Sequence, residues 1–160
     1  MKASKYMALA FENRLAPAAG LPVDMPQAEL TSRLNIAVVF TSVQPTLAAL
    51  KEAGLLAARL CGRITLLVPQ VVPYPLPLTS PPVLIDWNVR RFSVIGAEST
   101  VDTSVRLYLC RDRMETLLEV LRPHSLIVVG GRKRWWPSDE KRLVRTLRRA
   151  GHEVIFKETE

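Results

Sequence analysis

The sequence has few residues of the types that build metal sites and disulfides. It contains two cysteines, Cys61 and Cys110, and two histidines, His124 and His152, with no clustering among them. Zinc ligands stand at short, characteristic spacings, so we expect no metal and no bound cofactor. We interpret the cysteines as reduced, small core residues and the histidines as turn residues, not as a disulfide or a catalytic pair.

Long apolar runs are missing as well. None approaches the roughly 18 to 20 residues that a membrane-spanning helix needs. The apolar stretch at residues 6–11 ends at Glu12 and is too short for a secretory signal, so we expect a cytoplasmic protein without a membrane span. Apolar residues nevertheless make up 48% of the 160-residue chain, which is enough for one domain with a sizeable core.

A catalytic constellation is the third feature that the sequence lacks. No nucleophile stands with a base and an orienting group, and no pair of acids falls where a ligand would bind. Of the function classes considered, an enzyme is the least supported.

Short apolar runs alternate with helical patterns along most of the chain. The expected strands are Leu34–Phe40, Ile64–Val72, Val105–Arg111, Ser125–Val129 and Val154–Phe156. Between them we expect helices from Pro45 to a stop at Gly62, from Val83 to Ile95, from a cap at Asp112 to Pro123, and from a cap at Ser138 to Ala150. This alternation predicts an α/β fold with a doubly wound, five-stranded parallel sheet.

The segment ahead of the first strand has a different character. Residues 1–32 mix alanine, proline and polar residues without a sustained helical or strand period. We interpret them as an N-terminal extension that could dock onto the domain formed by residues 33–160.

Three stretches of the sequence match one protein family in order and composition. They are Ile36–Val39 followed by Gln44–Leu50, Ile64–Val68 followed by Val71–Pro73, and Ser125–Gly130. From about Leu34 to Lys157 the chain thus resembles the universal stress proteins. The resemblance implies a sheet like that of the adenine nucleotide alpha hydrolases, with strand order 3-2-1-4-5, and often dimers joined along the fifth strand.

The ATP-binding motif of that family is absent. Its ATP-binding members carry an Asp at the end of the first strand and the pattern G-x-x-G-x(9)-G-[ST] after the fourth. Here Thr41 stands in place of the Asp, and Gly130 matches the first glycine, but Lys133 and Leu143 occupy the next two glycine positions. The resemblance therefore implies a stress-response regulatory or interaction module that does not bind ATP in the family's manner.

The carboxyl ends of the first and fourth predicted strands meet at the switch point of such a sheet, where ligands bind in open α/β folds. Another anionic small molecule or nucleotide could bind there. The candidate ligand-binding residues are Thr41, Ser42, Val68, Gly130, Gly131, Arg132, Lys133 and Ser138. Thr41 and Ser42 could instead cap the helix that follows them.

The most unusual feature is the basic–aromatic segment, Arg132–Pro137, with the sequence Arg-Lys-Arg-Trp-Trp-Pro. Together with the helix after it, residues 132–149 carry a net charge of +6 out of +7 for the chain. The candidate partner-binding residues are Arg134, Trp135, Trp136, Arg142, Arg145 and Arg149. They could recognise an anion, nucleic acid, an acidic protein or anionic lipid. Alternatively, the tryptophans cover the edge of the domain and the bases are merely solvated.

The last predicted strand carries a prediction about assembly. Val154, Ile155 and Phe156 form a short apolar strand, which the family's strand order places at an edge of the sheet. Unpaired backbone groups at an apolar edge favour pairing with a second copy. We therefore expect a homodimer along this strand. The alternative is a monomer in which residues 1–32 fold back over the edge.

Overall fold

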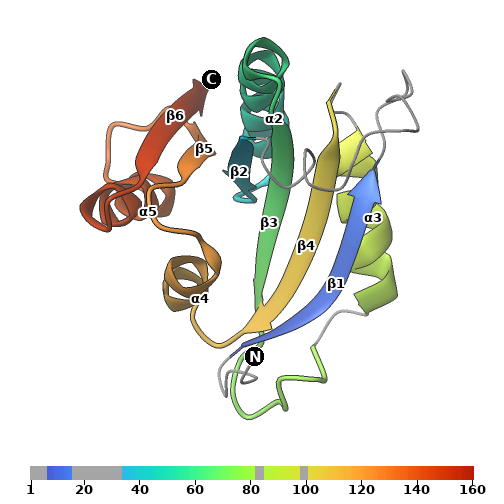
Figure 1. The fold of residues 1–160 in the computed structure, drawn as a ribbon. Coiled ribbons are helices and arrows are strands. Elements are labelled where there is room, and N and C mark those ends of the chain that lie inside the picture. The colour runs from blue at the N-terminus through green and yellow to red at the C-terminus, as the bar shows by residue number, and fades with distance from the viewer. Residues whose placement is uncertain (1–6, 16–33, 82–84, 98–100) are drawn as a thin grey trace.

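A computed structural model describes residues 7–15, 34–81, 85–97 and 101–160 (Figure 1). The sheet has six strands in the order β1-β4-β3-β2-β5-β6. In that order the strands are Met7–Leu15, Thr103–Cys110, Arg63–Val71, Asn35–Val39, Leu126–Arg132 and Glu153–Thr159. From β4 to β6 the neighbours are all parallel, so the predicted five-stranded parallel sheet and its strand order are confirmed.

Within the described residues, two helices cover each face of the sheet. The helices are α2 (Val43–Leu60), α3 (Ile85–Ala97), α4 (Arg113–Val120) and α5 (Asp139–Arg149). One core joins buried residues of α2 and α3 to the sheet, and a second core joins those of α4 and α5 to the other face. The central strand β2 serves both cores, because alternate side chains of a strand point to opposite faces: Ile36 lies in the first core and Ala37 in the second.

The sixth strand corrects the interpretation of the N-terminal extension. Met7–Leu15 forms β1, which pairs antiparallel with β4 and contains an irregularity between Leu9 and Phe11. An exposed ion pair joins Arg106 Nε of β4 to Glu12 Oε1 of β1 at 3.0 Å, and Ala10 and Phe11 pack against the first core. The segment shows little strand pattern because β4 supplies the backbone partner and only part of one face is buried. Residues 16–33, which belong to the same predicted extension, lie outside the described residues.

The end of α2 differs from the prediction in two details. Cys61, not Gly62, is the left-handed residue that ends the helix, with φ of 51°, and its side chain is exposed rather than part of the core. Gly62 is needed for a different reason, since a Cβ there would lie 2.9 Å from the carbonyl oxygen of Leu34. Cys110 is buried, as expected.

The last two strands are longer than the sequence suggested. We expected Gly130 and Gly131 to end the fourth predicted strand, but β5 continues through both to Arg132. The reason is β6, which extends to Thr159 and pairs with these positions: Gly130 with Lys157, Gly131 with Glu158 and Arg132 with Thr159. Among the described residues, no helix has the length and apolar character to cross a membrane.

Candidate functional site

The switch point between the ends of β2 and β5 is filled by the protein's own groups. The Thr41 hydroxyl donates a hydrogen bond to the carbonyl oxygen of Gly130 at 2.8 Å, and the Thr41 N–H donates to Oγ1 of the buried Thr46 at 3.1 Å. A Cβ at Gly130 would overlap the backbone of Pro45. The first turn of α2 therefore lies directly on the strand end.

The extension of β5 places Gly130 and Gly131 in a β-ladder instead of a loop. Gly131 has a similar close approach to a side chain, since a Cβ there would lie 2.6 Å from Cζ of Phe156. In a phosphate-binding loop, glycines let several backbone N–H groups converge on an anion. Here both glycines permit close packing within the sheet and against α2.

Arg113 is a residue of this region that the sequence analysis missed. It begins α4, and its Nη2 donates to the carbonyl oxygen of Phe40, directly before Thr41, at 2.6 Å. Burial lowers the pKa of the Arg113 guanidinium, while the nearby Glu140 and Asp139 carboxylates act in the opposite direction. A base in the first turn of a helix opposes the helix dipole, and this was the signal that the sequence offered.

The basic–aromatic segment lies beyond the switch point and is exposed. Trp135 and Trp136 have relative exposures of 101% and 81%, so neither ring covers the edge of the domain as the alternative interpretation required. Two hydrogen bonds hold the backbone directly before the tryptophans: the Lys133 N–H donates to the carbonyl of Thr159 at 2.8 Å, and Lys141 Nζ donates to that of Arg134 at 2.8 Å. The segment therefore presents its tryptophans from a fixed frame.

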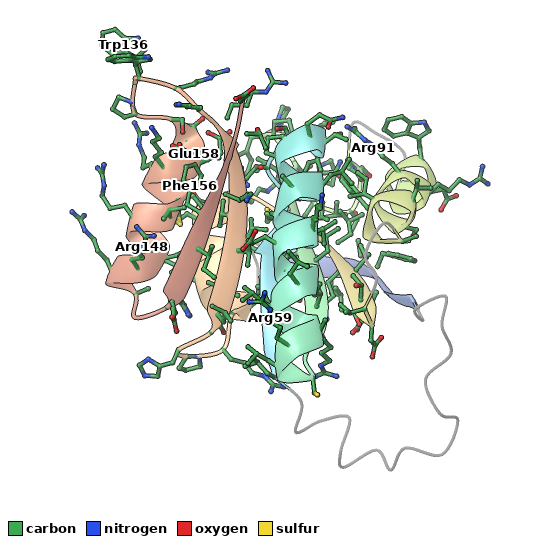
Figure 2. All side chains as sticks on the ribbon, turned by 90° about the horizontal axis from the view of Figure 1, so that it is seen from above. Arg59, Arg91, Trp136, Arg148, Phe156 and Glu158 are labelled. Carbon is green, nitrogen blue, oxygen red and sulfur yellow. The ribbon has the colours of Figure 1, made fainter. Side chains whose placement is uncertain are left out.

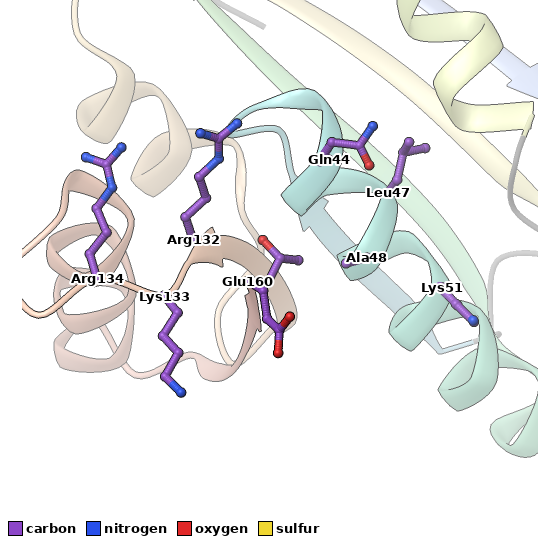
Figure 3. Close-up of a pocket in the computed structure, with 9 residues that line it drawn as sticks. Gln44, Leu47, Ala48, Lys51, Arg132, Lys133, Arg134 and Glu160 are labelled. Carbon is purple, nitrogen blue, oxygen red and sulfur yellow. The ribbon is translucent and has the colours of Figure 1, made fainter.

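A shallow pocket of about 660 Å³ separates the basic–aromatic segment from α2 (Figure 3). Its wall on α2 is formed by Gln44, Leu47, Ala48 and Lys51, and the opposite wall by Arg132, Lys133, Arg134, Thr159 and Glu160. Figure 3 shows the side chains of Arg132 and Arg134 extending to one side and that of Lys133 to the other. The pocket gathers four bases and one carboxylate, a composition that suits a small anion.

Helix α5 follows the segment and has two chemically distinct faces. The Ser138 hydroxyl accepts from the Lys141 N–H at 3.3 Å, which confirms the predicted cap. Leu143, Val144 and Leu147 are buried in the second core. The candidate partner-binding residues Arg142, Arg145 and Arg149 are all exposed.

The remaining candidate residues are placed as follows. Val68 is only 2% exposed, and its side chain lies in the first core. Ser42 takes the cap position of α2, but its side chain makes no capping hydrogen bond. On β6, Val154 is buried and Phe156 packs on the second core, while Ile155 packs on the first.

The two histidines lie together at the opposite end of β5. His152 Nδ1 accepts from the Ser125 N–H at 3.2 Å, and His124, with φ of 56°, has its Nδ1 3.2 Å from the Gly151 carbonyl oxygen. Desolvation, with a smaller effect of His124, lowers the pKa of the His152 imidazole. Within the described residues no three metal-binding side chains cluster.

Comparisons with known proteins support the fold. No protein-family model and no curated protein matches the sequence. Among solved structures, a universal stress protein from Archaeoglobus fulgidus is similar with a TM-score of 0.54 and 16% identity, over 81% of this chain and 97% of that one. A protein from the universal stress protein family of Burkholderia pseudomallei is similar with a TM-score of 0.53 and 22% identity, over 76% of this chain and 93% of that one. The chain therefore has the universal-stress-protein fold that its sequence resembles.

Proposed function

We propose that the protein is a regulatory or interaction module that does not bind ATP at the switch point. Its binding surface is the basic–aromatic segment, together with the exposed face of α5. The function rests on recognition of a partner and not on catalysis.

The observation that carries this proposal is the path of β5 through Gly130 and Gly131. A phosphate cradle needs a loop whose N–H groups face the ligand. At these positions the backbone pairs with β6 and packs against Pro45, and the Thr41 hydroxyl is already bonded to the Gly130 carbonyl. Triphosphate binding in the family's manner would require β5 and β6 to separate and α2 to move.

Isothermal titration of the full chain with ATP and magnesium tests the proposal. We expect no saturable heat at millimolar ATP. A one-to-one complex with a micromolar dissociation constant would contradict it, unless the same affinity disappears in the variant R132A/K133A. That second result would indicate that ATP binds in the pocket beside α2 and not at the switch point.

This pocket supports a second candidate function, the binding of another small anion. Lys51 approaches it from α2 and three consecutive bases approach from the segment. Inorganic phosphate is a suitable probe, with Arg59 as a control, because Arg59 is an exposed base on α2 outside the pocket lining. Phosphate binding that is lost in K51A/K133A and kept in R59A would support this function; equal binding by both variants would exclude it.

We also propose that two copies pair along β6. Strand β1 lies on the β4 edge, so residues 7–15 do not cover β6. In an antiparallel pair with Ile155 opposite its own copy, Glu153 faces Lys157 of the second copy on both sides of the two-fold axis. Both side chains are exposed, and the contact of Lys157 with Glu52 at 3.3 Å is a surface pair that contributes little.

Charge reversal tests this register. We expect E153K to weaken dimerisation roughly tenfold by placing like charges opposite each other, and E153K/K157E to restore it. Light scattering over a concentration series provides the measurement. A monomer at all concentrations would exclude the dimer, whereas a dimer that is indifferent to E153K would exclude only the register.

A further inference from the structure

Trp135 and Trp136 form an exposed aromatic pair at the tip of the basic–aromatic segment. Their relative exposures are 101% and 81%. A single exposed apolar side chain is common on protein surfaces, but two large neighbouring ones are less so. Figure 2 shows Trp136 projecting away from the body of the domain, beyond the ends of the strands. Two adjacent, solvent-exposed indole rings are typical of an interaction surface that is covered when a partner binds.

Hydrogen bonds within the protein support the segment that carries the two rings. Lys141 Nζ holds the carbonyl of Arg134, the Lys133 N–H holds that of Thr159, and Ser138 caps the helix that follows. Pro137 restricts the backbone between the tryptophans and the cap. Binding at this tip therefore orders few additional groups, and little conformational entropy is lost.

Positive charge surrounds the tip. Arg132, Lys133 and Arg134 precede the rings, and α5 carries the exposed bases Arg142, Arg145 and Arg149. None of these six side chains forms an ion pair with a carboxylate of the described residues. Their charge remains available to an anionic partner.

Resting on the proposed function, we propose that this surface docks the protein reversibly onto anionic phospholipid membranes. Trp135 and Trp136 enter the headgroup region, and the surrounding bases meet the lipid phosphates and carboxylates. Tryptophan is enriched at that depth because its ring is apolar while its N–H still finds a polar partner. Basic residues near an anionic leaflet add electrostatic attraction.

The arrangement of the rings favours a membrane over single-stranded nucleic acid. Nucleic-acid sites place aromatic rings along a basic groove that follows the backbone. Here the rings stand at a projecting tip, whereas no aromatic residue lines the neighbouring pocket, whose bases share it with the carboxylate of Glu160. A projecting tip with charge around its base fits a flat interface.

Helix α5 does not insert into the membrane in this arrangement. Its apolar residues Leu143, Val144 and Leu147 are buried in the second core, so the exposed side chains of the helix are polar and most of them are bases. Two tryptophans and a set of bases are each weak anchors, and stable attachment takes both signals together. We therefore expect binding that is reversible and weakened by salt.

Co-sedimentation of the full chain with vesicles tests the proposal, using phosphatidylcholine alone and phosphatidylcholine with one third phosphatidylglycerol. We expect binding only to the anionic vesicles. We expect W135A/W136A to lower the apparent affinity roughly tenfold or more, because the two rings that would enter the headgroup region on binding are lost. The matched control is W87A on α3, a helix that packs with β4 and β1 at the opposite edge of the sheet; residue Trp87 is 56% exposed. W87A should bind as the unchanged protein does.

The triple variant R142Q/R145Q/R149Q tests the charge separately from the rings. We expect the affinity to fall about 100-fold, since each base near the surface contributes about fivefold. Absence of vesicle binding overturns the proposal, as does equal binding to neutral vesicles. Tight binding of a single-stranded oligonucleotide without vesicle binding assigns the surface to nucleic acid instead. The result of the ATP titration is independent of all these outcomes, so failure of either proposal is recognised separately.

Discussion

Two regions near the carboxyl end of β5 lie only a few residues apart in the sequence but differ sharply in how their residues are packed. At the switch point, Gly130 lies against Pro45 and its carbonyl accepts from Thr41. Only a few residues later, Trp135 and Trp136 are almost entirely in solvent. The first region is closed by backbone packing, and the second presents large side chains without packing them.

This difference indicates how the position of a binding surface can shift within one fold. In open α/β sheets a crevice forms at the switch point because the chain leaves the two neighbouring strands toward opposite faces of the sheet. Continued pairing of β5 with β6 carries the strand past that opening to Arg132, while the first turn of α2 and the Thr41 hydroxyl fill the opening at Gly130. Beyond the end of β5 the basic–aromatic segment projects into solvent, with its bases and both tryptophans exposed.

The largest effect that tests this comparison is expected from G130A. The new methyl group would overlap the backbone of Pro45, which cannot move aside without shifting α2. Overpacking of this kind costs about 3 kcal/mol. For a chain of this size we expect the melting temperature to fall by roughly 6–12 °C, measured by circular dichroism.

The neighbouring substitution G131A provides the control. Its methyl group meets Cζ of Phe156 at 2.6 Å, which is the end of a side chain and not backbone. We expect a smaller loss of stability, relieved in G131A/F156L. Equal tolerance of G130A and G131A would show that the switch point is not closed as described.

A smaller effect is expected from T46V. Valine preserves the shape of the fully buried Thr46 but removes the oxygen that accepts from the Thr41 N–H. A buried donor left unpaired costs about 1–3 kcal/mol, and we expect a loss at the lower end of that range because this bond is only part-buried. Urea unfolding should show a lower midpoint with an unchanged m-value, and an unchanged midpoint would contradict this role of Thr46.

The hydrogen bond between the two strand ends is tested by T41V, with a loss of about 1 kcal/mol. Its effect is smaller because Thr41 is only partly buried, so water can replace part of the bond. The variant T41S keeps the hydroxyl and is the matched control. If T41V were as stable as T41S, the bond to Gly130 would not contribute to closing the switch point.

Sequence periodicity predicted the parallel sheet because buried strands such as β2 carry their own apolar pattern. It missed β1, whose stability depends on pairing with β4 and not on a pattern of its own. It also ended β5 at Gly130, because a glycine pair signals a loop unless one knows that β6 continues beside it. Arg113 was missed for a related reason, since its bond to Phe40 joins elements far apart in the sequence.

The sequence indicated the position of the candidate binding surface better than its geometry. The run of bases and tryptophans in Arg132–Pro137 was visible from composition alone. Whether Trp135 and Trp136 cover the domain or project from it depends on the direction in which the chain leaves β5, and that is set by the pairing with β6. A pattern within one segment carries no information about that direction.

The smallest effect is expected on the exposed side of the comparison, from the triple variant R132A/K133A/R134A. The three side chains are exposed, and the hydrogen bonds that hold the segment use backbone groups of Lys133 and Arg134, which alanine retains. Surface substitutions of this kind change stability by about 0.5 kcal/mol each or less. Removing three neighbouring like charges also relieves some repulsion, which offsets part of any loss. We therefore expect a melting temperature within a few degrees of the unchanged protein, by calorimetry at two salt concentrations. A fall of roughly 10 °C or more would show that these side chains support the fold, and the contrast with the closed switch point would then disappear.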